Sequence, residues 1–318
     1  MSYGASSTRR PRRTKAQVEE LRTELYALVE AARPCSVRHV YYLGIGWLWD
    51  KDSGGSRRNY SVVVRELGLM RERGDLPWEW ITDGTRRVQQ EIAYDSIEDA
   101  MDHTAQHYRR NLWSTQTRRV EVWCESDSVA GVLEPVTSAW GVSLYSCRGQ
   151  SSKTFVHEAV AEYTRHGKPV SVIFAGDFDP TGRAVPRSVV TRVNRYSGGD
   201  GLDLSFRQIA VTASDVSSGE FVTHDVNTRD VNYSRYRQEC LSERIDPHNA
   251  VEIEALSPGL LRTRLSEAIE SEVDDVRQWN IQSHTEQAER ELLRSLQASV
   301  HDIVRNATDK SVIDNNDG

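Results

Sequence analysis

Three acidic residues follow two apolar segments that have the alternation of β-strands. Glu125 follows the segment VEVWC, and Asp177 and Asp179 follow the segment VSVIFAG. Ligands of open parallel sheets bind beyond the carboxyl ends of the strands, so we expect the three carboxylates to converge at one edge. Converging carboxylates repel one another unless a cation lies between them. Mg²⁺ accepts one or two carboxylates and keeps water or phosphate as other ligands, so these three residues predict a magnesium site.

A tyrosine and an arginine lie one helical turn apart in the segment 38–42, which reads RHVYY. Arg38 and Tyr42 are four residues apart and would share one face of a helix. A tyrosine hydroxyl has a reference pKa of about 10, so it needs a base or a nearby cation to act as a nucleophile. Arg38 would favour the phenolate or hold a phosphate. The apolar neighbours also allow a second interpretation, in which Tyr42 is a core residue with a hydrogen-bonded hydroxyl.

The elements that must position these residues begin with three short helical patterns, at about 15–33, 36–49 and 57–73. The aromatic and β-branched segment 75–87 follows them and predicts a strand pair. Three helices and a strand pair are typical of a winged helix-turn-helix domain, whose third helix enters the major groove of DNA. The predicted DNA contacts on or beside that helix are Arg57, Arg58, Arg65 and Arg71.

From residue 119 onward, strand and helix patterns alternate, which predicts an α/β fold with a parallel, Rossmann-like sheet. Charged helical patterns follow at about 258–307. The predicted parts of the chain are a disordered basic arm (1–14), the winged-helix domain (15–117), the sheet domain (118–240), a C-terminal helical region (241–307) and a disordered tail (308–318).

Composition limits the class of protein. The net charge is −7, but basic residues outnumber acidic ones within residues 1–120, and a local basic patch matters more to DNA than the total charge. No stretch approaches the roughly 18 apolar residues of a membrane-spanning helix. The four cysteines have no zinc-binding spacing, which indicates reduced thiols and a cytoplasmic location.

The order of these motifs resembles the A subunit of topoisomerase VI and its relative, the meiotic double-strand-break protein. A strand that ends in glutamate, followed by a strand that ends in DFDPTG (177–182), is similar to the pattern of the Toprim fold. The segment RHVYY is similar to the Arg-x-x-Tyr/Phe-Tyr motif of the family. The segment LPWEW (76–80) is similar, more weakly, to the short A-type proteins of mobile elements that lack a B subunit. The resemblance covers about residues 15–200.

This resemblance implies an enzyme that cleaves double-stranded DNA with Mg²⁺. By resemblance, Tyr42 would form a 5′-phosphotyrosyl link with the help of Arg38, and Glu125, Asp177 and Asp179 would hold the metal. In that family the tyrosine of one subunit works with the metal of another, so a homodimer is implied. A separate ATPase subunit is left open, because no ATPase domain is evident in the sequence.

Two departures from the family keep alternatives open. His39 stands where the family more usually has an acid or Gln. The family's Gly-Tyr-Pro-Asp stretch corresponds to CRGQS (147–151), in which only Gly149 is kept. One alternative is a hydrolytic Toprim nuclease, similar to the nuclease of the Wadjet plasmid-defence system, whose acids would activate water. The other is a DNA-binding protein without catalysis.

Overall fold

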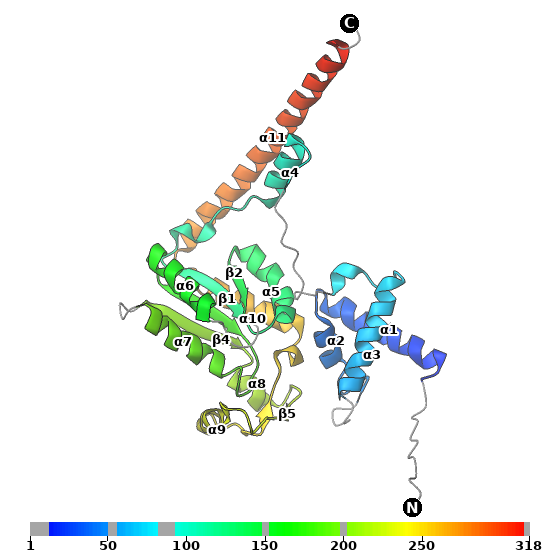
Figure 1. Ribbon diagram of the computed structural model, residues 1–318, viewed down its shortest axis with the longest axis vertical. Helices are drawn as coiled ribbons and strands as arrows, with labels where there is room; N and C mark the ends of the chain where they lie inside the picture. The colour runs from blue at the N-terminus through cyan, green and yellow to red at the C-terminus, as the bar shows by residue number, and fades with distance from the viewer. Residues whose placement is uncertain (1–12, 50–55, 82–92, 148–152, 198–201, 315–318) are drawn as a thin grey trace, which may run out of the picture.

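A parallel β-sheet with helices on both faces lies at the centre of the molecule (Figure 1). The computed structural model describes residues 13–49, 56–81, 93–147, 153–197 and 202–314. The sheet has the strand order β2-β1-β3-β4 and contains β1 (Arg119–Cys124), β2 (Ser143–Ser146), β3 (Val170–Ala175) and β4 (Leu204–Ala210). Every pairing in this sheet is parallel. The predicted mixed α/β fold with a parallel sheet and C-terminal helices is therefore confirmed.

Side-chain alternation along the strands builds two apolar cores, one on each face of the sheet. Val122 and Ile173 belong to one core, and their neighbours Trp123 and Phe174 belong to the other. Four helices cover these cores: α5 (Asp127–Trp140) and α10 (Pro258–Glu270) on the first face, and α6 (Lys153–His166) and α7 (Ala184–Tyr196) on the second. Because both faces are covered, β1 and β3 are buried almost throughout.

A single carboxylate, Glu121, is buried inside β1. Its oxygens accept hydrogen bonds from Tyr163 Oη at 2.6 Å, Trp123 Nε1 at 3.1 Å and Arg119 Nε at 2.8 Å. A buried charge is tolerated when it is paired and hydrogen-bonded in this way. The contact with Tyr163 also ties α6 to the sheet.

Three helices form a separate apolar core at the N-terminal side: α1 (Lys15–Ala32), α2 (Val37–Leu43) and α3 (Ser56–Glu72). Thr14 begins α1 with a capping box, and the Ser36 hydroxyl accepts from the His39 amide to begin α2. Leu25, Val40 and Leu67 are almost fully buried between the helices. The three predicted helices are therefore present, and α2 ends before Gly44.

The strand pair predicted from residue 75 onward does not form up to residue 81. Residues Trp78–Trp80 make a short 3-10 helix, η1, instead. Leu76 and Ile81 are buried on either side of it, and the Cys35 amide donates to the Trp80 carbonyl at 3.1 Å. Burial of these two flanking residues therefore shapes the segment into a compact turn. Residues 82–87 of the predicted wing lie outside the described residues, as do residues 1–12 of the basic arm.

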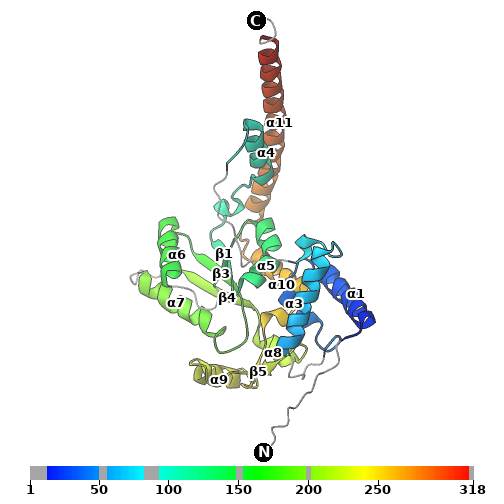
Figure 2. The same ribbon diagram turned by 45° about the vertical axis from the view of Figure 1, so that its right-hand side comes forward.

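Helix α11 (Val276–Asp314) projects away from the sheet, and α4 (Ile97–His107) lies along it in both views (Figures 1 and 2). The Tyr108 hydroxyl donates to Glu289 at 2.6 Å, and Gln297 donates to Asp102 at 2.7 Å. This pairing of distant segments was not foreseen from the sequence, which placed residues 97–107 in the first domain. The tail predicted to be disordered from residue 308 is wrong up to Asp314, because α11 continues that far. Among the described residues, no helix has the length and apolar character needed to cross a membrane.

Short elements connect the sheet to α10. They are α8 (Ala213–Ser218), β5 (His224–Asp225), α9 (Tyr233–Ser242), β6 (Asn249–Ala250) and η3 (Ile253–Ala255); a further 3-10 helix, η2 (Leu112–Thr115), precedes β1. Asp215 caps α8 and forms two hydrogen bonds with Arg264 of α10, at 2.8 and 2.6 Å. Burial raises the pKa of Asp215, but hydrogen bonds from Arg264 and Thr212 outweigh it and hold the pKa below its ordinary value.

Replacing Asp215 by Asn should lower the free energy of unfolding by about 2 kcal/mol, because Arg264 loses a mostly buried charged partner. The lowered pKa of Asp215 means that its contribution is present above the unfolded pKa of about 4 and is lost as the pH falls below it. Urea unfolding at about pH 7 and about pH 3.5 measures the effect, and the difference between the two proteins should shrink at the lower pH.

Asp302→Asn is the matched control, because Asp302 is exposed on α11. It should change the free energy of unfolding by no more than about 0.5 kcal/mol. Equal effects of the two substitutions at neutral pH would show that the Asp215–Arg264 pair does not stabilise the fold.

Candidate active site at the sheet edge

The strand order places the predicted acids at one point of the sheet. β1 and β3 are neighbours, and the chain winds away from them in opposite directions, to β2 on one side and to β4 on the other. Such a switch point is where open α/β sheets bind ligands. Glu125 follows β1, Asp177 follows β3, and the Asp177 amide donates to Glu125 Oε2 at 2.8 Å. The structure therefore brings these two predicted residues into direct contact.

Two glycines make room for the Glu125 carboxylate. A Cβ atom at Gly176 would lie 3.0 Å from Glu125 Oε2, and one at Gly182 would lie 3.2 Å from it. A Cβ at Gly182 would also overlap the backbone carbonyl oxygen of Asp177. The turn after β3 therefore needs glycine because the carboxylate and the backbone approach it closely.

The third predicted acid, Asp179, lies in the same turn. Its Oδ1 accepts from the Gly182 amide at 2.6 Å, which closes the turn before α7 begins. Burial raises the pKa of Asp179, and the charges of Asp230 and Glu252 act in the same direction. All three predicted carboxylates therefore lie near the carboxyl ends of β1 and β3.

A distant segment adds two further acids to this site. Phe178 and Val251 exchange backbone hydrogen bonds of 2.9 and 3.1 Å as an antiparallel bridge. The Ile253 amide then donates to Asp177 Oδ1 at 2.8 Å. This pairing carries Glu252 and Glu254, on either side of Ile253, to the same edge. We call Glu125, Asp177, Asp179, Glu252 and Glu254 the acidic edge.

Negative charge is crowded at the acidic edge. Burial raises the pKa of Glu125 to about 7, and the charges of Asp179 and Glu254 add to the effect. Burial raises the pKa of Asp177 well above its ordinary value, and the charge of Glu125 adds to it. The pKa of Glu254 is also raised, mainly by burial, although the positive charge of Arg38 opposes this. Each shift means that the ionised form is unfavourable without a compensating cation.

Helix α2 brings Arg38 and Tyr42 to the acidic edge. Arg38 forms an ion pair and hydrogen bond with Glu252, and its Nε lies 3.7 Å from Glu254 Oε1. Burial lowers the pKa of Arg38, but the carboxylates of Glu254 and Glu252 outweigh it and raise the pKa overall. Arg38 of the predicted tyrosine motif thus contacts two residues of the acidic edge.

The hydroxyl of Tyr42 is hydrogen-bonded to Glu252. Burial raises the pKa of Tyr42 above its ordinary value, and the charge of Glu252 and this hydrogen bond raise it further. The charge of Arg38 and a hydrogen bond with it lower the pKa of Tyr42, but by less. The ring is half-buried against the N-terminal core and lies 6.2 Å from the His224 ring, measured between centroids. The ring of Tyr42 therefore packs on the apolar core, as one interpretation of the sequence expected. Its hydroxyl points to the acidic edge, as the interpretation of Tyr42 as a nucleophile requires.

The donor chemistry of the acidic edge fits magnesium, since every candidate ligand is a carboxylate oxygen. Within the described residues, however, no three His, Cys, Asp or Glu side chains are arranged to hold a metal ion. One oxygen each of Glu125, Asp177 and Asp179 accepts a backbone amide. Two carboxylates with water and substrate phosphate are sufficient for Mg²⁺, so a pair of these residues has the ligand chemistry that the cation needs.

The predicted DNA contacts on α3 have mixed surroundings. Arg65 is 62% exposed and pairs with the buried Glu66 at 2.7 Å. Arg71 lies over the Trp78 ring, with 4.2 Å between its guanidinium carbon and the ring centroid. The side chains of Arg57 and Arg58 lie outside the described residues, as does Gly149.

His39, the departure from the family motif, is fully buried, and its Nδ1 lies 2.8 Å from Ser36 Oγ. Burial lowers the pKa of His39 to about 3, and the charges of Arg262 and Arg38 contribute. The side chain is therefore neutral at physiological pH and takes a structural place in the core of the N-terminal helices.

Sequence reasoning missed Glu252, Glu254 and His224. The segment VEIEAL (251–256) has the apolar–acidic alternation of a half-buried strand, which was the available signal. Nothing in its spacing relates it to residue 178, because backbone pairing between distant segments depends on the tertiary fold.

Comparison of the sequence with protein-family profiles and with curated proteins gave no match.

Gly182→Ala should lower the free energy of unfolding by roughly 1–3 kcal/mol, because its Cβ would overlap the Asp177 carbonyl and press on Glu125. Gly68→Ala is the matched control: it lies inside α3 with open space around it, so alanine should stabilise by about 0.5–1 kcal/mol. Thermal unfolding of both variants measures the effects. If the two variants unfold alike, the turn is not held as tightly as described.

Proposed function

We propose that this protein is a Mg²⁺-dependent enzyme that cleaves double-stranded DNA at the acidic edge, with an N-terminal winged helix and a Toprim-type sheet domain. One observation carries the proposal. Arg38 and Tyr42, the residues of the tyrosine motif, contact Glu252, while Ile253 next to it donates to Asp177 of the predicted metal site. Two motifs that are independent in the sequence thus meet at one place.

Glu125, Asp177 and Asp179 would hold the cation, which would stabilise negative charge on the phosphate oxygens. Arg38 lies close enough to Tyr42 to lower its pKa and would bind a phosphate in exchange for Glu252. Guanidinium groups bind phosphate with two parallel hydrogen bonds, which orients the group as well as holding it. When the substrate phosphate binds Arg38, the Glu252 carboxylate leaves it, so Arg38 would have an anionic partner both before and after binding.

Tyr42 would act as the nucleophile. Its oxygen forms a bond to phosphorus, the bond from phosphorus to the 3′ oxygen of the deoxyribose breaks, and the 3′ oxygen takes a proton from water. The phenolic proton passes to Glu252, which already accepts a hydrogen bond from this hydroxyl. The product is a 5′-phosphotyrosyl link and a free 3′ hydroxyl. A general base is needed here because the pKa of Tyr42 is raised by burial and by Glu252.

The same raised pKa favours a second candidate function. A buried tyrosine that stays protonated is a weak nucleophile, and a hydrolytic nuclease would need only the acids to activate water. In that reaction Tyr42 would position Glu252 and would leave no covalent link. The family resemblance implies a homodimer in which the tyrosine of one subunit works with the metal of another, whereas the reaction proposed here uses Tyr42 and the acids of one chain. The homodimer and a separate ATPase subunit are proposals from the resemblance alone, and a cytoplasmic location is a proposal from the cysteine content.

Thermal unfolding of the Asp177→Asn variant tests metal binding without a measurement of activity. The Asn oxygen can still accept the Ile253 amide, but one of several repelling charges is removed, so the variant should unfold at a higher temperature than the wild type in EDTA. Mg²⁺ should raise the unfolding temperature of the wild type because it binds the folded state, and should have little effect on the variant. An equal effect of Mg²⁺ on both proteins would remove Asp177 from the metal site.

Plasmid cleavage tests the reaction itself. With Mg²⁺, Asp177→Asn should reduce cleavage by roughly 100-fold or more, because transition-state charge loses its stabilisation. Tyr42→Phe should abolish cleavage, and the wild type should leave protein attached to DNA ends until protease is added. Tyr26→Phe is the matched control, since Tyr26 packs on Trp80 away from the acidic edge.

Each outcome of that assay selects one function. Cleavage retained in Tyr42→Phe and lost in Asp177→Asn, with protein-free ends, identifies the hydrolytic nuclease. No Mg²⁺-dependent cleavage by the wild type on relaxed, supercoiled or linear DNA would overturn both catalytic proposals and leave a DNA-binding protein.

A further inference from the structure

A basic cavity of about 450 Å³ opens between α7 and α9. Three arginines of α7 line one side: Arg187, Arg192 and Arg195. Arg235 of α9 and Asn232, which precedes α9, line the other. Helix α7 follows the turn that holds Asp179, so the cavity and the acidic edge are connected by one short segment of the chain.

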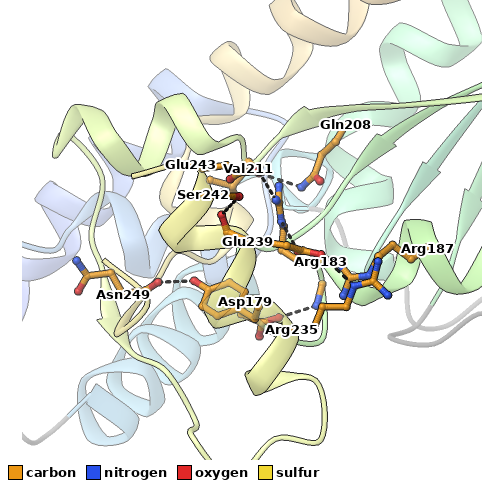
Figure 3. A network of polar contacts seen from close by, with 12 residues as sticks. Asp179, Arg183, Arg187, Gln208, Val211, Arg235, Glu239, Ser242, Glu243 and Asn249 are labelled. Atoms are coloured by element: carbon orange, nitrogen blue, oxygen red, sulfur yellow. Dashed lines mark hydrogen bonds and ion pairs between the residues drawn. The ribbon is translucent and has the colours of Figure 1, made fainter. Parts of the chain in front are cut away.

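Several arginines beside the cavity share one acidic partner. Figure 3 shows Arg183, Arg187 and Arg235 directed toward one carboxylate, Glu239. The nitrogen–oxygen distances are 3.7, 2.7 and 3.3 Å, respectively. Arg183 has a second partner in Glu243 at 2.6 Å. The sequence of α7, AVPRSVVTRVNRY, contains three arginines and no acidic residue.

Arg187 is partly buried in this group of arginines. Burial lowers the pKa of Arg187, and the charge of Arg235 acts in the same direction although Glu239 opposes it. A guanidinium group in this situation gains from an additional anion, since the anion offsets both the neighbouring charge and the loss of solvent.

We propose that the cavity binds phosphate groups of a nucleic-acid backbone, namely those that flank the phosphate at the acidic edge. Arginine presents a planar fork of donors that matches phosphate oxygens, and Asn232 and Ser188 add neutral polar groups. From Arg187 to Arg195 the helix advances about 12 Å, a length over which one strand of duplex DNA carries roughly three or four phosphates. The cavity therefore holds several phosphates along one strand and sets the direction of the backbone across the site.

This inference takes its partner from the proposed function but does not require cleavage. Duplex DNA binding is measured in EDTA, where a metal-dependent enzyme does not cut. The cavity variant is Arg195→Ala combined with Arg235→Ala. Its matched control is Arg165→Ala combined with Arg237→Ala, because these arginines are exposed on α6 and α9 and do not line the cavity.

The readout is fluorescence anisotropy of a labelled duplex at several salt concentrations. Each lost phosphate contact should reduce the slope of log K against log salt by about 1, so the cavity variant should lose about 2 and the control variant nothing. Circular dichroism confirms that both variants keep the wild-type helix content. A wild-type slope in the cavity variant, or an equal loss in the control, overturns the proposal.

Calorimetric titration with inorganic pyrophosphate distinguishes a small phosphorylated ligand from a polymer. The proposal expects weak pyrophosphate binding by the wild type that the cavity variant loses together with its DNA affinity. Tight pyrophosphate binding with unchanged DNA affinity in the cavity variant would assign the cavity to a small molecule instead. If the wild-type protein binds neither DNA nor pyrophosphate, the proposed phosphate site is refuted. If it binds DNA but does not cleave it, only the catalytic proposals are contradicted.

Discussion

Two backbone hydrogen bonds between Phe178 and Val251 are the contact on which the site depends. They join the turn after β3 to a segment that arrives much later in the chain. The join places the Ile253 amide on Asp177 and sets Glu252 opposite Arg38. Without it, the acids at the sheet edge and the tyrosine motif on α2 would belong to separate parts of the molecule.

The electrostatic consequence is a site in which like charges are held together by the fold. Burial and neighbouring carboxylates raise the pKa of Glu125, Asp177 and Glu254, and backbone amides offset part of that cost. Such an arrangement is unfavourable for stability and favourable for binding a cation, because the cation removes the repulsion. On the adjoining helix α7 the sign is reversed, because the helix contains three arginines that line the cavity and no acidic residue. A polyanion that carries a bound cation would match both charges: its cation matches the acidic edge, and its anionic groups match the arginines of α7.

The central fold and three of the site residues were predictable because they depend on local patterns. Apolar segments with flanking helices predict a parallel sheet, and the carboxyl ends of neighbouring strands converge in any such sheet. Helix starts at Thr14 and Ser36 follow from capping preferences of single residues. The predicted strand pair after α3 was wrong up to residue 81 because burial of Leu76 and Ile81 overrides β-propensity there.

The sequence by itself determined the types of chemistry available: carboxylates at strand ends, an arginine one turn before a tyrosine, and basic residues along particular helices. Only the tertiary structure decided which of these groups meet. It joined Glu252 to Arg38 and Tyr42, and it set Arg187 and Arg235 around Glu239. It also laid α4 along α11. These contacts link residues far apart in the chain, and their formation depends on the summed packing of the whole molecule, which no local spacing records.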